Sequence, residues 1–189
     1  MLTKPYILFV VSLLLSCLCA SAQRPSAGMY NSVKGFGLSF SLQSEDGEMD
    51  VFTAYADIYG IPSGRSKVPG AKFNYSHQFV FTTLVFNDAV LDIYAGPGVT
   101  AGYVHDHESG FFTDYDKPLL LNMGVVGALS GTVGCVFSFS RKLMLDLSWT
   151  VEGGIHMRRD ETLENIDLKL YKNGLTQAWM PQLVIRSFF

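Results

Sequence analysis

Residues 143–157 alternate between two kinds of side chain along their whole length. Every odd position holds an apolar residue or glycine, and the even positions hold polar residues or glycine, apart from Met144. Because a β-strand points successive side chains to opposite faces, the pattern predicts one strand with an apolar face and a polar face. Soluble strands usually have roughly five or six residues, and membrane-spanning strands about 9–11. The length of this segment therefore favours a strand that crosses a membrane.

Seven other segments also alternate, and polar or turn-forming residues separate them. Together the eight predicted strands are residues 33–43, 51–59, 72–86, 90–104, 119–139, 143–157, 165–172 and 176–189. We therefore predict an all-β fold: a closed, antiparallel transmembrane β-barrel of eight strands.

Alternation alone does not say which face is inside, because a soluble barrel buries its apolar face and a membrane barrel turns it outward. The apolar faces of the six best segments carry no Lys, Arg, Asp or Glu, and His77 and a few hydroxyl groups are their polar exceptions. The opposite face of residues 119–139 is small and polar, which suits the narrow interior of an eight-stranded barrel. Both observations favour the membrane barrel. The alternative is an exported soluble β-barrel that binds a hydrophobic ligand inside.

Residues 119–139 also permit another interpretation, since they contain no charged residue and are long enough for a transmembrane helix. Several glycines and a period of two favour the strand instead.

The first residues predict a signal peptide spanning residues 1–22. Lys4 supplies the positive charge, an apolar run follows at residues 6–15, and small residues at positions 20 and 22 predict cleavage after Ala22. The alternative is a lipoprotein processed at Cys17.

After this segment we expect an N-terminal lead-in at residues 23–32 and one barrel domain at residues 33–189. Cleavage would leave Cys135 as the single cysteine, which excludes an intrachain disulfide and a cysteine-based metal site. The formal net charge is only -3, without a basic stripe, so we expect no nucleic-acid partner.

The sequence ends in two phenylalanines, and apolar residues alternate back from Phe189 through Ile185 and Leu183. Together with the signal peptide, this resembles the small eight-stranded outer-membrane β-barrel proteins of Gram-negative bacteria. The resemblance implies a monomer in the outer membrane, in contact with its lipid and lipopolysaccharide. It also implies that Phe189 is a signal for the barrel-assembly machinery. An interfacial aromatic residue is the simpler interpretation of the same position.

The eight predicted strands conflict with the loop lengths expected of such barrels. If both ends of the barrel lie in the periplasm, residues 87–88 and 140–142 become outer loops, and the long segment 106–118 becomes periplasmic. Outer-membrane barrels usually have short periplasmic turns and long outer loops. Either the asymmetry is inverted, or residues 165–172 belong to an outer loop and an extra strand lies near residues 24–32.

The polar faces of the predicted strands carry a set of charges that a closed barrel would place in its lumen. Buried charges are costly unless they are paired, so we expect a network that closes the lumen rather than a wide pore. Arg186 would pair with Asp146 if residues 140–142 lie at the periplasmic rim, and with Glu152 if they lie outside. The expected network is Asp92, Asp146, Glu152, Lys169 and Arg186.

The sequence does not indicate an enzyme or a cofactor. Ser148, Glu152 and His156 share one strand face, but successive members are roughly 13 Å apart, too far for a catalytic triad. His105 and His107 are candidate metal ligands, and a polar loop without metal is the preferred interpretation. We expect a structural, surface-interaction or small-ligand role, with a lipid-A-modifying barrel enzyme as a further alternative.

Overall fold

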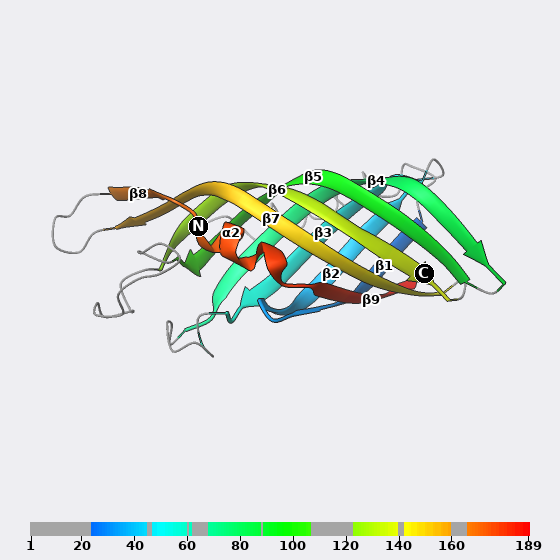
Figure 1. The fold of residues 1–189 in the computed structure, drawn as a ribbon. Helices are drawn as coiled ribbons and strands as arrows, with labels where there is room; N and C mark the ends of the chain where they lie inside the picture. Colours follow the sequence, from blue (N-terminus) through cyan, green and yellow to red (C-terminus); the bar gives the residue numbers. More distant parts are fainter. Residues whose placement is uncertain are drawn as a thin grey trace, which may run out of the picture.

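The computed structural model describes residues 24–44, 47–59, 61, 68–87, 89–106, 123–139, 142–159 and 166–189. The predicted signal peptide and His107 lie outside these residues. The described chain contains nine strands (Figure 1). They are β1 (Arg24–Ser32), β2 (Gly35–Gln43), β3 (Met49–Asp57), β4 (Gly70–Phe86), β5 (Ala89–His105), β6 (Met123–Ser138), β7 (Leu143–Arg159), β8 (Ile166–Leu170) and β9 (Gln182–Phe188). Strands β1 to β8 alternate in direction, and β9 runs the same way as β8.

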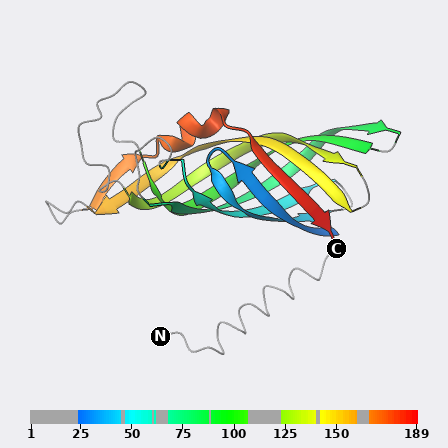
Figure 2. The ribbon, with the colours of Figure 1, turned by 90° about the horizontal axis from the view of Figure 1, so that it is seen from below.

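Eight of these strands close into an antiparallel ring. Neighbours in sequence pair from β1 to β7, and β9 closes the ring by pairing with both β7 and β1. The ring is visible from the side in Figure 1 and from below in Figure 2. The predicted fold class, a closed antiparallel barrel of eight strands, is therefore confirmed, but two of its members are different.

The first difference is at the N-terminal side of the barrel. Residues 24–32, expected to be a lead-in, form β1, which pairs with β2 along its full length. Pro25, two serines and Gly28 weaken the alternation of this segment, and so the sequence pattern under-predicts it. The second difference is β8, which lies outside the ring and pairs only with the end of β7, from Ile155 to Arg159.

A short helical segment interrupts the region expected to be one closing strand at residues 176–189. Helix α2 (Asn173–Thr176) and the 3-10 turn η2 (Gln177–Trp179) lie between β8 and β9. The helical segment ends before Pro181, because the residue preceding a proline is pushed out of the helical region. The wall beside the middle of β7 is consequently filled by helix instead of a paired strand.

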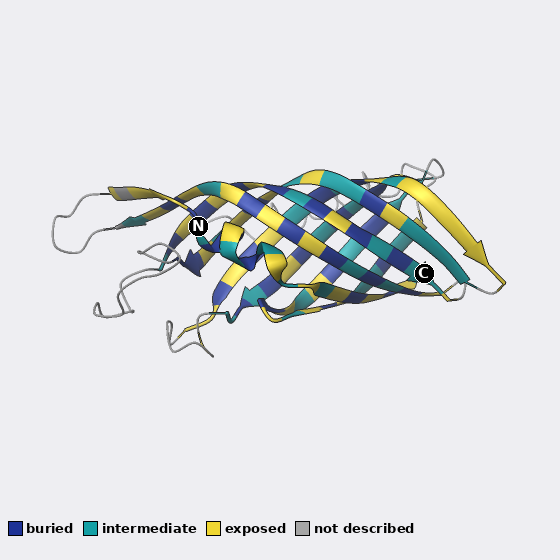
Figure 3. Cartoon of the chain, in the orientation of Figure 1, coloured by how far each residue is buried: buried dark blue, intermediate teal, exposed yellow. Residues whose placement is uncertain are grey.

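Buried and exposed residues alternate along the strands (Figure 3). The exposed positions are largely apolar and many of the buried ones are polar, so the apolar faces point outward and the polar faces inward. On β6, Leu129 and Val133 are exposed while the intervening Ser130 and Thr132 are buried. Residues 123–138 are thus a strand and not the alternative helix. No helix within the described ranges is long and apolar enough to span a membrane.

The extra strand β1 removes the conflict over loop lengths. The chain passes from β2 to β3, from β4 to β5 and from β6 to β7 at the same end of the barrel as Arg24 and Phe189; we call this the short-turn end. At the opposite end, which we call the long-loop end, it passes from β1 to β2, from β3 to β4, from β5 to β6 and from β7 to β8. Three of those four connections are longer than any turn at the other end.

Candidate functional site

One cluster of charged and hydroxyl groups crosses the barrel interior near the short-turn end. Arg186 of β9 lies 2.8 Å from the Asp146 carboxylate of β7 (Nη1 to Oδ2), and both side chains are almost fully buried. The Tyr94 hydroxyl of β5 donates to the other carboxylate oxygen at 2.6 Å. The same guanidinium donates from Nη2 to the Ser39 hydroxyl of β2 at 3.2 Å. These contacts link four strands of the ring; we call this set the lower cluster.

The lower cluster stands next to a layer of apolar side chains. Buried Met49, Val51, Val136 and Met144 pack together with the Tyr94 ring, and Val80 and Phe188 pack against them. An apolar layer of this kind lowers the local dielectric and so strengthens the neighbouring ion pair.

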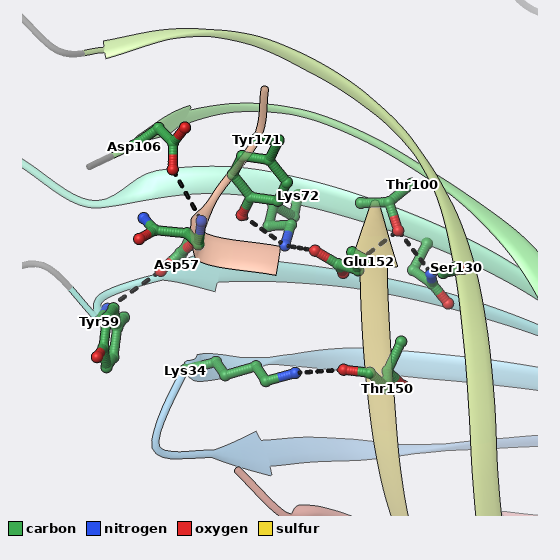
Figure 4. A network of polar contacts seen from close by, with 12 residues as sticks. Lys34, Asp57, Tyr59, Lys72, Thr100, Asp106, Ser130, Thr150, Glu152 and Tyr171 are labelled. Atoms are coloured by element: carbon green, nitrogen blue, oxygen red, sulfur yellow. Dashed lines mark hydrogen bonds and ion pairs between the residues drawn. The ribbon is translucent and has the colours of Figure 1, made fainter. Parts of the chain in front are cut away.

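A second cluster crosses the interior nearer the long-loop end (Figure 4). Lys72 of β4 forms a buried ion pair with Glu152 of β7 and donates to the Tyr171 hydroxyl at 3.1 Å. Thr100 of β5 donates to the remaining Glu152 oxygen at 3.3 Å. Asn74 extends the network, because its amide donates to the Thr100 hydroxyl at 2.8 Å. We call this set the upper cluster.

Between Ser148 and Ile155, one edge of β7 has no strand partner within the described chain, and the barrel wall is interrupted there. Lys34, in the turn between β1 and β2, supports this part of the wall. Its side chain is buried, and its Nζ donates to the Thr150 carbonyl of β7 at 3.2 Å (Figure 4). Farther along the same stretch of β7, the Tyr171 N–H donates to the Gly154 carbonyl at 2.9 Å. Buried backbone carbonyls need a donor. A lysine and the segment beside α2 thus provide hydrogen bonds on the edge of β7 that neither β8 nor β9 pairs here.

Backbone groups near the long-loop end are held by Asp106. Its carboxylate accepts from the N–H groups of Lys172 and Asn173, at 3.1 and 2.9 Å. The Asn173 amide donates in turn to the His105 carbonyl at 2.7 Å. Asp106 therefore fixes the start of α2 to the end of β5.

The charges predicted for the lumen separate into different places. Asp146 and Arg186 pair with each other, near the end of the barrel where β6 ends and β7 begins. Glu152 pairs instead with Lys72, in a separate cluster. Asp92 lies where β5 extends past the ring and accepts from Thr83 at 2.6 Å. Lys169 is exposed on β8, outside the ring. The single five-membered network is thus wrong: the ring register brings together other residues.

The sequence interpretation missed Lys34, Lys72, Tyr94 and Tyr171. Lys72 shares the polar face of its strand with Asn74 and Ser76, and that shared face was an available signal. Tyr94 and Tyr171 gave no such signal, because an apolar ring with a polar tip suits either face of a strand.

The other candidate residues are placed as follows. Phe189 is exposed, and its N–H donates to the Pro25 carbonyl at 3.3 Å. His105 is buried. Of the three residues considered for acyl hydrolysis, Glu152 is held by Lys72, and His156 Nε2 lies 3.0 Å from the Val104 carbonyl oxygen. Within the described ranges, no three His, Cys, Asp or Glu side chains gather as a metal site.

An antiparallel ring of eight strands, apolar outside and polar with ion pairs inside, defines the outer-membrane type of β-barrel. A solved structure agrees: a major outer membrane protein from Thermus thermophilus matches with a TM-score of 0.56 at 13% identity, over 89% of this chain and 100% of that chain. The Yersinia pestis attachment invasion locus protein Ail, crystallised with the heparin analogue sucrose octasulfate, matches with a TM-score of 0.36 at 13% identity, over 88% of this chain and 96% of that chain.

This chain therefore has the fold of the outer-membrane β-barrel proteins. No known family profile matches the sequence, and no curated protein matches it significantly.

Proposed function

We propose that this protein is an outer-membrane barrel with a closed lumen, which anchors and displays its long loops for contacts at the cell surface. In this proposal it is neither a wide pore nor an enzyme. The observation that carries the proposal is the pair of charged clusters, which cross the interior at two depths.

Each cluster joins strands from different sides of the ring. The lower cluster links β2, β5, β7 and β9 through Arg186 and Asp146. The upper cluster links β4, β5 and β7 through Lys72 and Glu152. An eight-stranded barrel has an interior just wide enough for side chains, so long side chains that meet across it leave no continuous water path. Two such layers support a barrel that does not conduct.

The unequal lengths of the connections at the two ends of the barrel support one orientation in the membrane. Barrels of this kind have short periplasmic turns and longer outer loops. We therefore place the short-turn end, with Phe189, in the periplasm and the long-loop end outside. There the exposed terminal aromatic would be available to the barrel-assembly machinery, and the long loops would meet lipopolysaccharide and other surface partners.

Planar-bilayer recording of the purified protein tests the closed lumen. We expect no sustained current steps from the natural protein. We expect steps from a variant in which Lys72, Glu152, Asp146 and Arg186 are all replaced by alanine, provided that it still shifts on boiling in a gel. Stable open-channel currents from the natural protein would contradict the closed lumen. A silent but folded alanine variant would show that other side chains close it.

A further inference from the structure

Two strands extend past the rest of the barrel at the short-turn end. β3 pairs with β4 only as far as the pair Met49 and Gln78, whereas β4 continues to Phe86. On the other side of the hairpin, β6 covers β5 down to the pair Val90 and Ser138. The protruding β4–β5 hairpin is visible in Figures 1 and 2. Within the described part of the chain, residues 79–86 of β4 thus keep one backbone edge that no strand pairs.

Apart from one bulge, this edge shows, among the described residues, none of the devices that usually protect an exposed strand. Natural edge strands carry lysines, prolines or covering loops, which stop another strand from pairing with them. Residues 79–86 contain no charged residue and no proline. A bulge between Val80 and Thr82 is the one irregularity. Beyond it every residue to Phe86 is exposed, with Phe81 at 68% and Val85 at 76%.

An acidic cluster lies beside the start of this edge, on the outer surface of the barrel. The Asp50 carboxylate accepts from the Tyr75 hydroxyl at 2.8 Å and lies 2.8 Å from His77 Nδ1. Glu48, in the turn before β3, lies 3.6 Å from His77 Nε2. Two carboxylates surround a single imidazole, so the cluster carries a net negative charge. It gives the start of the edge a negative potential.

The same cluster indicates where the membrane ends on this side. Charged side chains on the lipid face are costly at the midplane and nearly free at the interface. Glu48 and Asp50 therefore mark the interface, and the hairpin extends beyond them, away from the hydrocarbon. Lipid then does not account for the apolar side chains that both hairpin faces expose.

We propose that the free edge of β4 is a strand-addition site for an extended segment of another protein. Such segments add to a sheet edge through backbone hydrogen bonds, and alternate side chains give specificity. The incoming strand would be antiparallel to β4 and would continue the line of β3. Its carboxyl end would reach Glu48 and Asp50, so the partner segment is apolar and alternating with basic residues at that end. This site goes beyond the proposed function, and in the proposed orientation the partner is periplasmic.

Fluorescence anisotropy with a synthetic peptide tests the site. The probe is a labelled peptide in which eight residues of alternating valine and threonine are followed by two arginines at the carboxyl end. It is titrated with the detergent-purified protein. We expect saturable binding, with increased hydrogen-exchange protection at residues 81–86. A peptide with the arginines at its amino end should bind about tenfold more weakly, because its charges would lie away from the acidic cluster.

Two lysine variants distinguish pairing at the free edge from nonspecific hydrophobic binding, and a third variant tests the acidic cluster. Val85→Lys places a charge on the free edge and should weaken binding about tenfold. Val90→Lys is the matched control, because Val90 lies opposite Val85 on the strand whose edges are both paired. It should bind like the natural protein. The combined Glu48→Gln and Asp50→Asn variant should lose the preference for carboxyl-terminal arginines while keeping the strand-dependent part of binding.

Three outcomes would overturn the proposal. Equal binding by the two lysine variants would show that the edge is not used. Concentration-dependent self-association of the natural protein, abolished by Val85→Lys, would assign the edge to a second copy. Absence of peptide binding in lipid nanodiscs, with the hairpin shielded from exchange, would assign it to the membrane. None of these results bears on ion conduction, so the closed lumen is judged separately.

Discussion

At the scale of single residues, the ion pair between Arg186 and Asp146 is the contact whose loss by mutation should reduce stability most. Both side chains are nearly inaccessible to water, at 1% and 2% exposure. Taking two charges out of water is expensive, and their attraction repays the cost only while both are present. The intact pair therefore adds little to the free energy of unfolding. The loss of one partner lowers that free energy strongly, because the other charge stays buried alone.

Replacing Asp146 by asparagine leaves the Arg186 charge buried without its counter-ion. We expect the free energy of unfolding to fall by about 3 kcal/mol, and to be largely restored when Arg186 is also replaced by glutamine. Urea titration in detergent micelles, followed by the gel shift of unboiled samples, measures both changes. Asp92→Asn on the protruding hairpin is the matched control and should change stability by about 0.5 kcal/mol or less. An equal loss from the two asparagine variants would contradict the importance of the lower cluster.

Residue patterns predicted one of the two ion pairs and missed the other. Arg186 lies near the end of the last predicted strand, so an acid at the same depth was expected as its partner, either Asp146 or Glu152 according to the orientation, and Asp146 is that acid. Lys72 and Glu152 come together only through the curvature of the ring and the registers of β4, β5, β6 and β7. Alternation assigns a residue to one face of its strand but does not align one strand with the next across a long loop, so the sequence could not predict this pair.

At the scale of elements, the interrupted wall beside β7 depends on a close approach of α2. A Cβ placed on Gly174 would lie 2.4 Å from the Glu152 carbonyl oxygen, far inside van der Waals contact. Only glycine therefore allows α2 to lie against the strand here. This requirement is invisible in the sequence, where Asn173 and Gly174 look like an ordinary turn between two strands.

Gly174→Ala should push α2 away from β7. We expect a loss of about 1–3 kcal/mol in unfolding free energy, as in other overpacked sites, and faster hydrogen exchange at residues 150–154. Gly153→Ala is the matched control, since a Cβ there meets nothing within 4 Å. Hydrogen exchange measured by mass spectrometry compares the two. If both variants exchange alike, the helix does not protect this part of the wall.

At the scale of the whole molecule, the alternating pattern predicted the barrel because one period of two governs every long strand. β6 and β7 alternate over nearly their full length and β4 alternates up to its bulge, so the existence of these strands followed from the alternation. The absence of charged residues on their apolar faces indicated that these faces point outward. Orientation depends on counting strands correctly. If one strand is missed, every connection is assigned to the wrong end of the barrel.

Cysteine labelling in intact cells tests the orientation. In a Cys135→Ser background, Val68→Cys at the long-loop end should react with a membrane-impermeant maleimide, and Asn87→Cys at the short-turn end should not. Both positions are exposed, so accessibility within the protein does not separate them. Permeabilised cells provide the control, because both cysteines should then react. The reverse pattern would place the short turns outside.

The unequal strand lengths have a consequence for the surrounding lipid. β5 and β7 have 17 residues each, whereas β1, β2 and β3 have nine and β9 has seven. A nine-residue strand is about 30 Å long, and at a tilt of about 40° it spans about 23 Å, close to the apolar band of about 25 Å that such barrels present, whereas the seven residues of β9 span only about 18 Å. The side of β9 therefore imposes a hydrophobic mismatch that the long strands do not.

This barrel should consequently thin the membrane along one flank, or lean toward it. Refolding yield into phosphatidylcholine vesicles should decrease as the acyl chains lengthen, and a yield that rises with bilayer thickness would show that the wall height is effectively uniform. A protein of this shape would favour thin regions of an outer membrane, and neighbours that also thin the bilayer would collect on the side of its short strands.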